Sequence, residues 1–379
     1  MRWVALRMLM GDRGKFLGLI FGVAFATLLM SQQVSIFMGI LTRTASQILD
    51  VRDADIWVMD NKVRFIDEVP PLADGDLQRV RGVPGVAWAV KFYKAQLLVR
   101  LEDGNSRSVI MMGIDDATFV GAPAEMIRGE LSDLRQPDAI IVDKAGYEYM
   151  WPNESYKLGR EIQINERRAV LVGICKASAP FTTLPILYSK YSTAANFAPK
   201  GRRMLTCVLA KPVEGMAGAD VCRRIEKQTG LMALTQEEFF WKTIFYFLGS
   251  TGIPVNFGIT ITLGFIVGAA VTGQTFYLFT VENLRQFGAL KAMGVTNRRL
   301  IGMILLQGLL VGCIGFCIGI GLTAFFFVGT SQVTVLAGLY MTMTALVGTG
   351  SAVLIIIMLT ALASIHRVLV LEPAVVFRG

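Results

Sequence analysis

Residues 243–281 read TIFYFLGSTGIPVNFGITITLGFIVGAAVTGQTFYLFTV and contain no Asp, Glu, Lys or Arg. Two further stretches are equally free of these residues, one between Lys15 and Arg43 and one between Arg299 and Arg367. A transmembrane helix needs about 20 apolar residues, so the three stretches predict one, one and two spans. Four membrane helices with one large hydrophilic insert exclude a cytosolic enzyme, a nucleic-acid-binding protein and an outer-membrane barrel.

Composition and charge agree with a multi-pass membrane protein. Only 17% of the 379 residues are charged and 53% are hydrophobic, whereas about a quarter of a soluble protein is charged. The two tails and the segment between spans two and three carry ten basic and three acidic residues, a net charge of +7, and the insert is nearly neutral. The positive-inside rule therefore places both termini in the cytoplasm and residues 43–250, approximately, outside the membrane.

The run FLGLIFGVAFATLLM (16–30) also fits the core of a signal peptide, with cleavage as the alternative. It is followed by polar SQQ and by no small-x-small cleavage site, so we expect a retained span. The resulting fold class is an α-helical membrane protein with four transmembrane helices and a large extracytoplasmic α+β domain. The predicted order is a cytoplasmic amphipathic helix (1–15), span one with a stalk (16–49), the extracytoplasmic domain (50–238), a stalk with span two (239–280), a short cytoplasmic helix (281–299), span three (300–328), span four (336–364) and a cytoplasmic tail (365–379).

The insert alternates strand-like and helix-like segments. ADIWVMD predicts a strand, LADGDLQRVRGVPG a helix, and VAWAVKFYKAQLLVRL with SRSVIMMGID a hairpin turned at EDGN. A second unit has the same order: MLTCVLAKP as a strand, GADVCRRIEKQTG as a helix and LMALTQEEF as a strand. The piece between them, about 117–195, predicts an inserted β-rich subdomain. Two glycines and a proline (Gly249, Gly252 and Pro254) predict a kink where the stalk meets the bilayer.

Glycines recur at GxxxG spacing inside the spans. Small residues at this spacing let helix backbones approach closely, because helices in lipid associate through packing. The pattern predicts helix-packing positions at Gly18, Gly22, Gly264, Gly268, Gly308, Gly312, Gly315 and Gly319.

Sequence signatures of catalysis are missing. The string GDRGK lacks the hydroxyl residue and the preceding strand of a phosphate-binding loop, and there is no HExxH or GxSxG. The single histidine, His366, lies at the opposite membrane face from the insert, and the five cysteines read as small buried hydrophobes. We therefore expect a non-catalytic subunit without a metal or cofactor of its own.

One segment resembles a known family. FTVENLRQFGALKAMGVTNRRLIGMILLQGLL is similar to the cytoplasmic loop and third span of permeases in the FtsX/MacB/LolC superfamily of ABC transporters, most specifically from Leu290 to Gly294. The architecture of one span, a large outside domain and three spans matches the same superfamily, with MacB-like porter and inserted β subdomains. Further strings, such as GVAFATLLM and LTQEEFF, most resemble the DevC type of tripartite envelope exporters.

The segment after span two also reads as a coupling helix from its own residues. Val281, Leu284, Phe287 and Leu290 form an apolar stripe that can lie in a partner's groove. Phe287 and Leu284 are the expected anchors and Gly294 the left-handed helix end; a plain membrane-surface loop is the alternative. Many superfamily members have Glu-Ile-Gly where Gln286, Phe287 and Gly288 stand, so Glu282 is the expected carrier of a Glu-dependent contact. The predicted coupling residues are Glu282, Leu284, Arg285, Phe287, Leu290, Lys291, Met293 and Gly294.

The resemblance implies a mechanotransmission permease. A separate ABC ATPase dimer would bind ATP and Mg and pull on two permease copies, most simply a homodimer. The outside domain would then pass a lipid, glycolipid or other envelope or efflux substrate to a HlyD-type adaptor and a TolC-type outer-membrane channel. Two other readings stay open: a non-transporting, FtsX-like regulator of a cell-wall hydrolase, and a membrane-anchored receptor.

Overall fold

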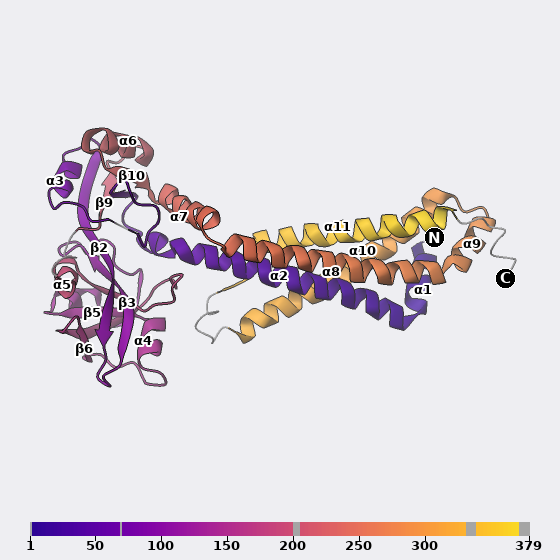
Figure 1. The fold of residues 1–379 in the computed structure, drawn as a ribbon, viewed down its shortest axis with the longest axis horizontal. Coiled ribbons are helices and arrows are strands. Elements are labelled where there is room, and N and C mark those ends of the chain that lie inside the picture. Colours follow the sequence, from indigo (N-terminus) through magenta and orange to yellow (C-terminus); the bar gives the residue numbers. More distant parts are fainter. Residues whose placement is uncertain (1, 69, 200–204, 331–338, 371–379) are drawn as a thin grey trace. The chain divides into compact units, whose positions relative to one another are not determined.

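A computed structural model describes residues 2–68, 70–199, 205–330 and 339–370 of the chain (Figure 1). These residues form two compact units. Ile40–Thr251 make up the first, an ectodomain built on a β-sheet, and Met1–Gly39 together with Gly252–Gly379 make up the second, a helical membrane unit.

The membrane unit is formed by helices α1 and α2 at the N-terminus and α8 to α11 towards the C-terminus. Among the described residues, four helical segments are long and apolar enough to cross a membrane: Arg13–Asp50, Ile253–Glu282, Asn297–Gly329 and Met343–Ser364. The chain is therefore a multi-pass membrane protein. The full helix bounds are α1 Arg2–Gly11, α2 Arg13–Asp50, α8 Ile253–Glu282, α9 Leu284–Ala292, α10 Asn297–Gly329 and α11 Met343–Val370.

Helices of the membrane unit pack through apolar side chains and a few buried polar contacts. Ser31 of α2 and Thr323 of α10 share a buried hydrogen bond, with 2.6 Å between their hydroxyl oxygens. Gln307 of α10 is fully buried, and its Nε2 donates to the backbone oxygen of Ala5 in α1 at 2.8 Å. The inward face of α1 thus holds Ala5 and Leu9, while Trp3 is 63% exposed on the opposite face.

The ectodomain contains one ten-stranded sheet in the order β10-β1-β9-β2-β3-β8-β5-β7-β4, with β6 paired to β2 and β7. The long strand β2 joins its two parts, because residues 86–92 pair with β9 and residues 93–100 pair with β3. The predicted hairpin is confirmed as the antiparallel pair of β2 and β3. The strands are β1 Ile56–Met59, β2 Val86–Arg100, β3 Ser106–Ile114, β4 Glu125–Arg128, β5 Ala139–Asp143, β6 Glu161–Ile164, β7 Arg167–Lys176, β8 Ile186–Lys190, β9 Cys207–Pro212 and β10 Met232–Thr235.

The first part of the sheet is a split β-α-β arrangement. Its strands run in the order β10-β1-β9-β2 with antiparallel neighbours, and α3 and α6 pack on it (Figure 1). The residues of about 117–195 add strands β4 to β8 to the same sheet, so the inserted piece is joined to β2 and β3. The ectodomain helices are α3 Asp76–Arg81, η1 Leu131–Arg135, α4 Lys144–Met150, α5 Tyr191–Phe197, α6 Gly218–Thr229 and α7 Gln236–Ser250.

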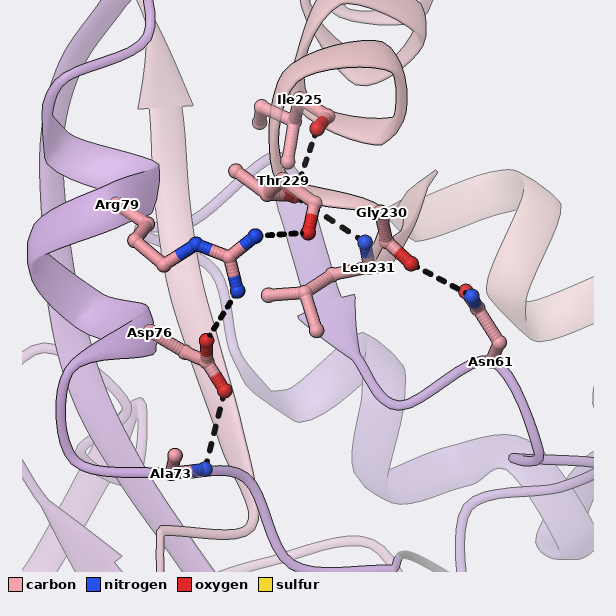
Figure 2. A network of polar contacts seen from close by, with 8 residues as sticks. All are labelled: Asn61, Ala73, Asp76, Arg79, Ile225, Thr229, Gly230 and Leu231. Carbon is pink, nitrogen blue, oxygen red and sulfur yellow. Dashed lines mark hydrogen bonds and ion pairs between the residues drawn. The ribbon is translucent and has the colours of Figure 1, made fainter.

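Figure 2 shows how the C-terminal end of α6 is held. Arg79 of α3 donates to the backbone oxygen of Thr229 and is itself paired with Asp76, at 2.8 Å between Nη1 and Oδ1. Asn61 donates from Nδ2 to the backbone oxygen of Gly230 at 2.6 Å. The last carbonyls of a helix lack hydrogen-bond donors within the helix. At the end of α6, the side chains of Arg79 and Asn61 donate these missing hydrogen bonds.

Three local predictions prove wrong. Residues 236–239 are helical, because Thr235 and Glu238 form a capping box that starts α7 directly after β10. The predicted kink at Gly249, Gly252 and Pro254 is a break: α7 ends at Ser250, and α8 starts at Ile253 with Pro254 in its first turn. Cys313 and Cys317 are exposed on the surface of the chain rather than buried.

Candidate ATPase-coupling site

The segment between α8 and α10 is a short helix set off by a turn at each end. Asn283 separates α8 from α9: its Nδ2 donates to the Phe279 oxygen at 2.8 Å, and its own backbone oxygen accepts from the Gln286 and Phe287 amides. The side chain therefore satisfies the last turn of α8, while the backbone begins α9.

Gly294 ends α9 with a φ of +87°, which confirms the predicted left-handed conformation. The Gly294 amide donates to the Lys291 oxygen at 3.0 Å and the Val295 amide to the Leu290 oxygen at 3.1 Å. These two bonds define a Schellman motif, and Val295 and Leu290 both pack in the same apolar cluster, as the motif favours. A residue with a branched Cβ would be strained at this φ.

The apolar stripe of α9 faces the chain's own core. Phe287 is 1% exposed and belongs to a cluster with Phe279, Leu300 and Met303, and Leu284 and Leu290 are partly buried against that cluster. The expectation that Phe287 is an anchor in a partner's groove therefore needs correction, because its ring is already buried in the apolar cluster of the membrane unit. A stripe at three-residue steps indicates a buried face but does not say which surface buries it.

The exposed long side chains of this segment are mostly basic, with one large apolar exception. Met293 is 72% exposed, and Arg285, Gln286, Arg298 and Arg299 are exposed beside it in the sequence, while Lys291 is partly exposed. Met293 was among the predicted coupling residues, whereas the exposed Gln286 was noted only as a departure from the family pattern. We define the coupling surface as Arg285, Gln286, Met293, Arg298 and Arg299.

Glu282 is engaged within the chain. Its carboxylate forms an ion pair with Lys15 near the start of α2, and Lys15 also pairs with Asp12 at 2.7 Å. The hydrogen bond from Lys15 holds the pKa of the Asp12 carboxyl below its usual range. Glu282 therefore joins the end of α8 to the base of α2, a role that its sequence position did not indicate.

All eight predicted packing glycines lie against another helix. A Cβ on Gly315 would lie 2.7 Å from Val23 Cβ, and one on Gly319 would lie 2.5 Å from Thr27 Cβ, so α2 and α10 approach closely there. Gly18, Gly22, Gly264 and Gly268 lie between α2 and α8, and Gly308 and Gly312 face Ile357 of α11. Among the described residues, no three His, Cys, Asp or Glu side chains are grouped to hold a metal ion.

Comparison with known proteins identifies the class. Residues 16–225 match the family model described as MacB-like periplasmic core domain, and residues 258–373 match that described as FtsX-like permease C-terminal. The chain belongs to this FtsX/MacB family of ABC transporter permeases. The fold is accordingly a four-span permease with a large MacB-like α/β ectodomain, and such a permease works with an ATPase partner.

Two relatives have low sequence identity to this chain but align with most of its length. An uncharacterized ABC transporter permease of Mycobacterium tuberculosis (strain ATCC 25618 / H37Rv) is 24% identical over 319 residues, which cover 82% of this chain and 80% of the relative. A second from the same strain is 22% identical over 341 residues, covering 88% and 87%.

Two solved structures are similar to parts of the chain. One is the extracellular domain of the noncanonic ABC-type transporter YknZ from Gram-positive bacteria, with a TM-score of 0.36, 14% identity and coverage of 48% of this chain and 98% of that one. The other is the periplasmic region of MacB from Actinobacillus actinomycetemcomitans, with a TM-score of 0.39, 16% identity and coverage of 54% and 96%.

Proposed function

We propose that this permease works by mechanotransmission. A separate ATPase dimer binds ATP and Mg, closes, and displaces the coupling surface of two permease copies that form a homodimer. Helix α2 then carries this displacement to the ectodomain outside the inner membrane, with both termini in the cytoplasm. The permease itself takes no part in ATP hydrolysis.

The observation that carries the proposal is the continuity of α2. This helix runs unbroken for 38 residues, from Arg13 to Asp50, and crosses from one compact unit into the other at Gly39. Its base is tied by Lys15 to Glu282, one residue before the turn into α9. A displacement of α9 therefore has a direct route to the start of α2.

The spans support handling of the substrate outside the membrane. Asp, Glu, Lys and Arg are absent from residues 16–42, 243–281 and 300–366, whereas transporters that move solutes through the membrane commonly place ionisable residues on the path. We therefore propose that the permease is a DevC-like exporter. Its ectodomain would deliver a lipid, glycolipid or other envelope substrate to a HlyD-type adaptor and a TolC-type outer-membrane channel.

The same uncharged spans also fit an FtsX-like regulator that activates a cell-wall hydrolase without transport. Deletion of the gene distinguishes the exporter from the regulator. An exporter defect changes the lipid composition of the outer envelope and leaves peptidoglycan hydrolysis at its normal level, whereas a regulator defect blocks peptidoglycan hydrolysis and leaves the lipids unchanged.

The coupling surface is tested by Met293→Asp in the permease coexpressed with its ATPase subunit. Loss of an exposed apolar anchor at an interface costs about 2 kcal/mol, and every 1.4 kcal/mol is about tenfold in affinity. We therefore expect at least about tenfold weaker binding of the ATPase, measured by copurification and titration, and a matching loss of ATP hydrolysis.

The matched control is Met216→Asp, which introduces the same change at an exposed methionine of the ectodomain. It should leave ATPase binding unchanged. Normal ATPase binding by the Met293→Asp protein, or robust hydrolysis by the permease purified alone, would contradict the proposed function.

A further inference from the structure

The ectodomain end of α2 is held by the side chain of Gln236. Its Nε2 donates to the backbone oxygen of Ile48 at 2.8 Å and to that of Val51 at 2.7 Å. The last carbonyls of a helix have no partner within the helix. A single amide group thus uses both of its N–H bonds to satisfy two carbonyls at the point where α2 ends.

A second attachment involves Asp50, the last residue of α2. A carboxylate is unfavourable at a helix C-terminus, where the helix dipole is negative, and no basic residue occupies the last turn. Ser178 supplies the missing donors: its backbone N lies 2.9 Å from Asp50 Oδ2 and its Oγ lies 2.7 Å from Oδ1. One turn earlier, Ser46 donates from Oγ to the Ala179 oxygen at 3.1 Å.

The two attachments come from different parts of the ectodomain. Gln236 directly follows β10 of the split β-α-β part and begins α7, whereas Ser178 lies between β7 and β8 of the inserted part. Apolar packing supports both, because Ile48 and Val51 are buried in one cluster with Phe239 of α7. The end of α2 is therefore fixed to each part of the sheet and to α7.

We infer that Gln236 and Ser178 are positioning residues that make the end of α2 the point where force enters the ectodomain. A displacement of α2 then moves the split β-α-β part and the inserted part together. This inference rests on the proposed mechanotransmission and names the residues that perform it at the outer end of the helix.

The test uses the full permease with its ATPase subunit, in a background without native cysteines. Spin labels are placed at Lys227 in the ectodomain and at Tyr340 in the membrane unit, both exposed, and labelled copies are diluted with unlabelled ones. The distance between the labels is measured without nucleotide and with ATP bound to a hydrolysis-deficient ATPase. ATP hydrolysis by the matching active complex is measured separately.

Gln236→Glu keeps the size of the side chain but replaces both donors with a carboxylate facing two carbonyls. We expect it to lose more than two thirds of the ATP-driven distance change while ATP hydrolysis stays within about twofold of the unmodified complex. Gln228→Glu, at an exposed position of α6, adds the same charge and should behave as the unmodified protein.

Ser178→Ala removes only the hydroxyl donor and should lose about half of the distance change, whereas Ser178→Thr, which keeps the hydroxyl, should restore it. If Gln236→Glu fails to fold, the comparison of Ser178→Ala with Ser178→Thr still tests the inference. A full-size change in both Gln236→Glu and Ser178→Ala would overturn the inference alone. No change in the unmodified complex would overturn the proposed function as well.

Discussion

The membrane unit and the ectodomain of this permease are each stabilised internally by a different kind of contact. In the membrane unit, helices meet where side chains are missing: a Cβ on Gly315 or Gly319 would collide with Val23 or Thr27 of α2. In the ectodomain, strands pair in one sheet, and polar side chains close the ends of helices, as Asp143 does for α4. The membrane unit thus depends on the fit between helix surfaces, and the ectodomain on satisfied hydrogen bonds at defined positions.

This difference follows from the surroundings of each unit. Lipid offers no gain for burying apolar groups between helices, so close packing of small residues decides which faces associate. Water competes for every polar group of the ectodomain, so a buried polar atom there is costly unless a protein partner is provided. Substitutions that remove or add volume at a packed position should therefore harm the membrane unit, and substitutions that remove a hydrogen-bond partner should harm the ectodomain.

The largest expected effect comes from Phe287→Ala in α9. Its ring is 1% exposed within the apolar cluster of the membrane unit, and removing such a ring from a core costs about 3–5 kcal/mol. We expect a large drop in thermal stability of the membrane unit in detergent. Met293→Ala, at an exposed position two residues before Val295, should change stability by less than about 0.5 kcal/mol. Equal stability of the two variants would show that Phe287 is not part of the core.

A second, slightly smaller effect is expected from Gly319→Val in α10. The new Cβ would lie 2.5 Å from Thr27 Cβ and 2.6 Å from the Ala24 oxygen, and overpacking of this kind costs about 1–3 kcal/mol. Gly321→Val is the control on the same helix, because nothing lies within 4 Å of its Cβ position. Thermal unfolding in detergent, followed by size-exclusion chromatography, compares them; similar losses in both would refute close contact between α2 and α10.

A third effect concerns pH and the ectodomain. Asp143 is 3% exposed and accepts from the Ile186 amide at 2.7 Å and the Gly146 amide at 3.1 Å. Burial raises the pKa of its carboxyl from 3.8 to about 6, although both amides act to lower it. The folded state then binds more protons than the unfolded state between about pH 4 and pH 6. The free energy of unfolding therefore falls as pH rises through this window and is level above it.

The measurement is thermal unfolding followed by tryptophan fluorescence, since four of the five tryptophans lie in residues 40–251. Relative to Asp143→Asn, the unmodified protein should gain about 1 kcal/mol on going from pH 7.5 to pH 5. A difference between the two proteins that does not change with pH would show that this carboxyl keeps its charge state over the range.

The smallest effect is expected at the surface of the ectodomain. Glu161 and Arg168 form an ion pair at 2.5 Å with both side chains more than half exposed, and exposed pairs of this kind add little to stability. Glu161→Gln should leave the unfolding temperature unchanged. A clear loss would mean that surface charge, as well as helix capping, stabilises the ectodomain.

Local signals in the sequence predicted the membrane unit well. The three uncharged stretches contain the four candidate spans found in the described part of the chain, and GxxxG spacing selected glycines that lie against other helices. Gly294 marks the end of α9 because the turn requires a positive φ, which glycine adopts without strain. The surface that buries Phe287 could not be predicted, since periodicity shows that a face is apolar and not what covers it.

Long-range contacts explain what the sequence left open in the ectodomain. The hairpin of β2 and β3 has a local turn signal, but the pairing of β3 with β8 joins residues more than 70 positions apart. Residues 236–239 are helical and not extended, because the capping box of Thr235 and Glu238 starts α7 directly after β10. Lys15 and Glu282 have no shared motif, so only the structure brings them together.

We propose that α2, as a continuous helix, transmits ATP-driven displacement to the ectodomain. This proposal is tested most directly by inserting Gly-Ser-Gly-Ser between Gly39 and Ile40, at the boundary of the units. The control is the same insertion between Thr251 and Gly252, where the chain is already non-helical between α7 and α8. The ATP-dependent distance between labels at Lys227 and Tyr340 is the readout. We expect the first insertion to abolish the distance change and the second to leave at least half of it. An undiminished change with the first insertion would show that α2 does not transmit the displacement.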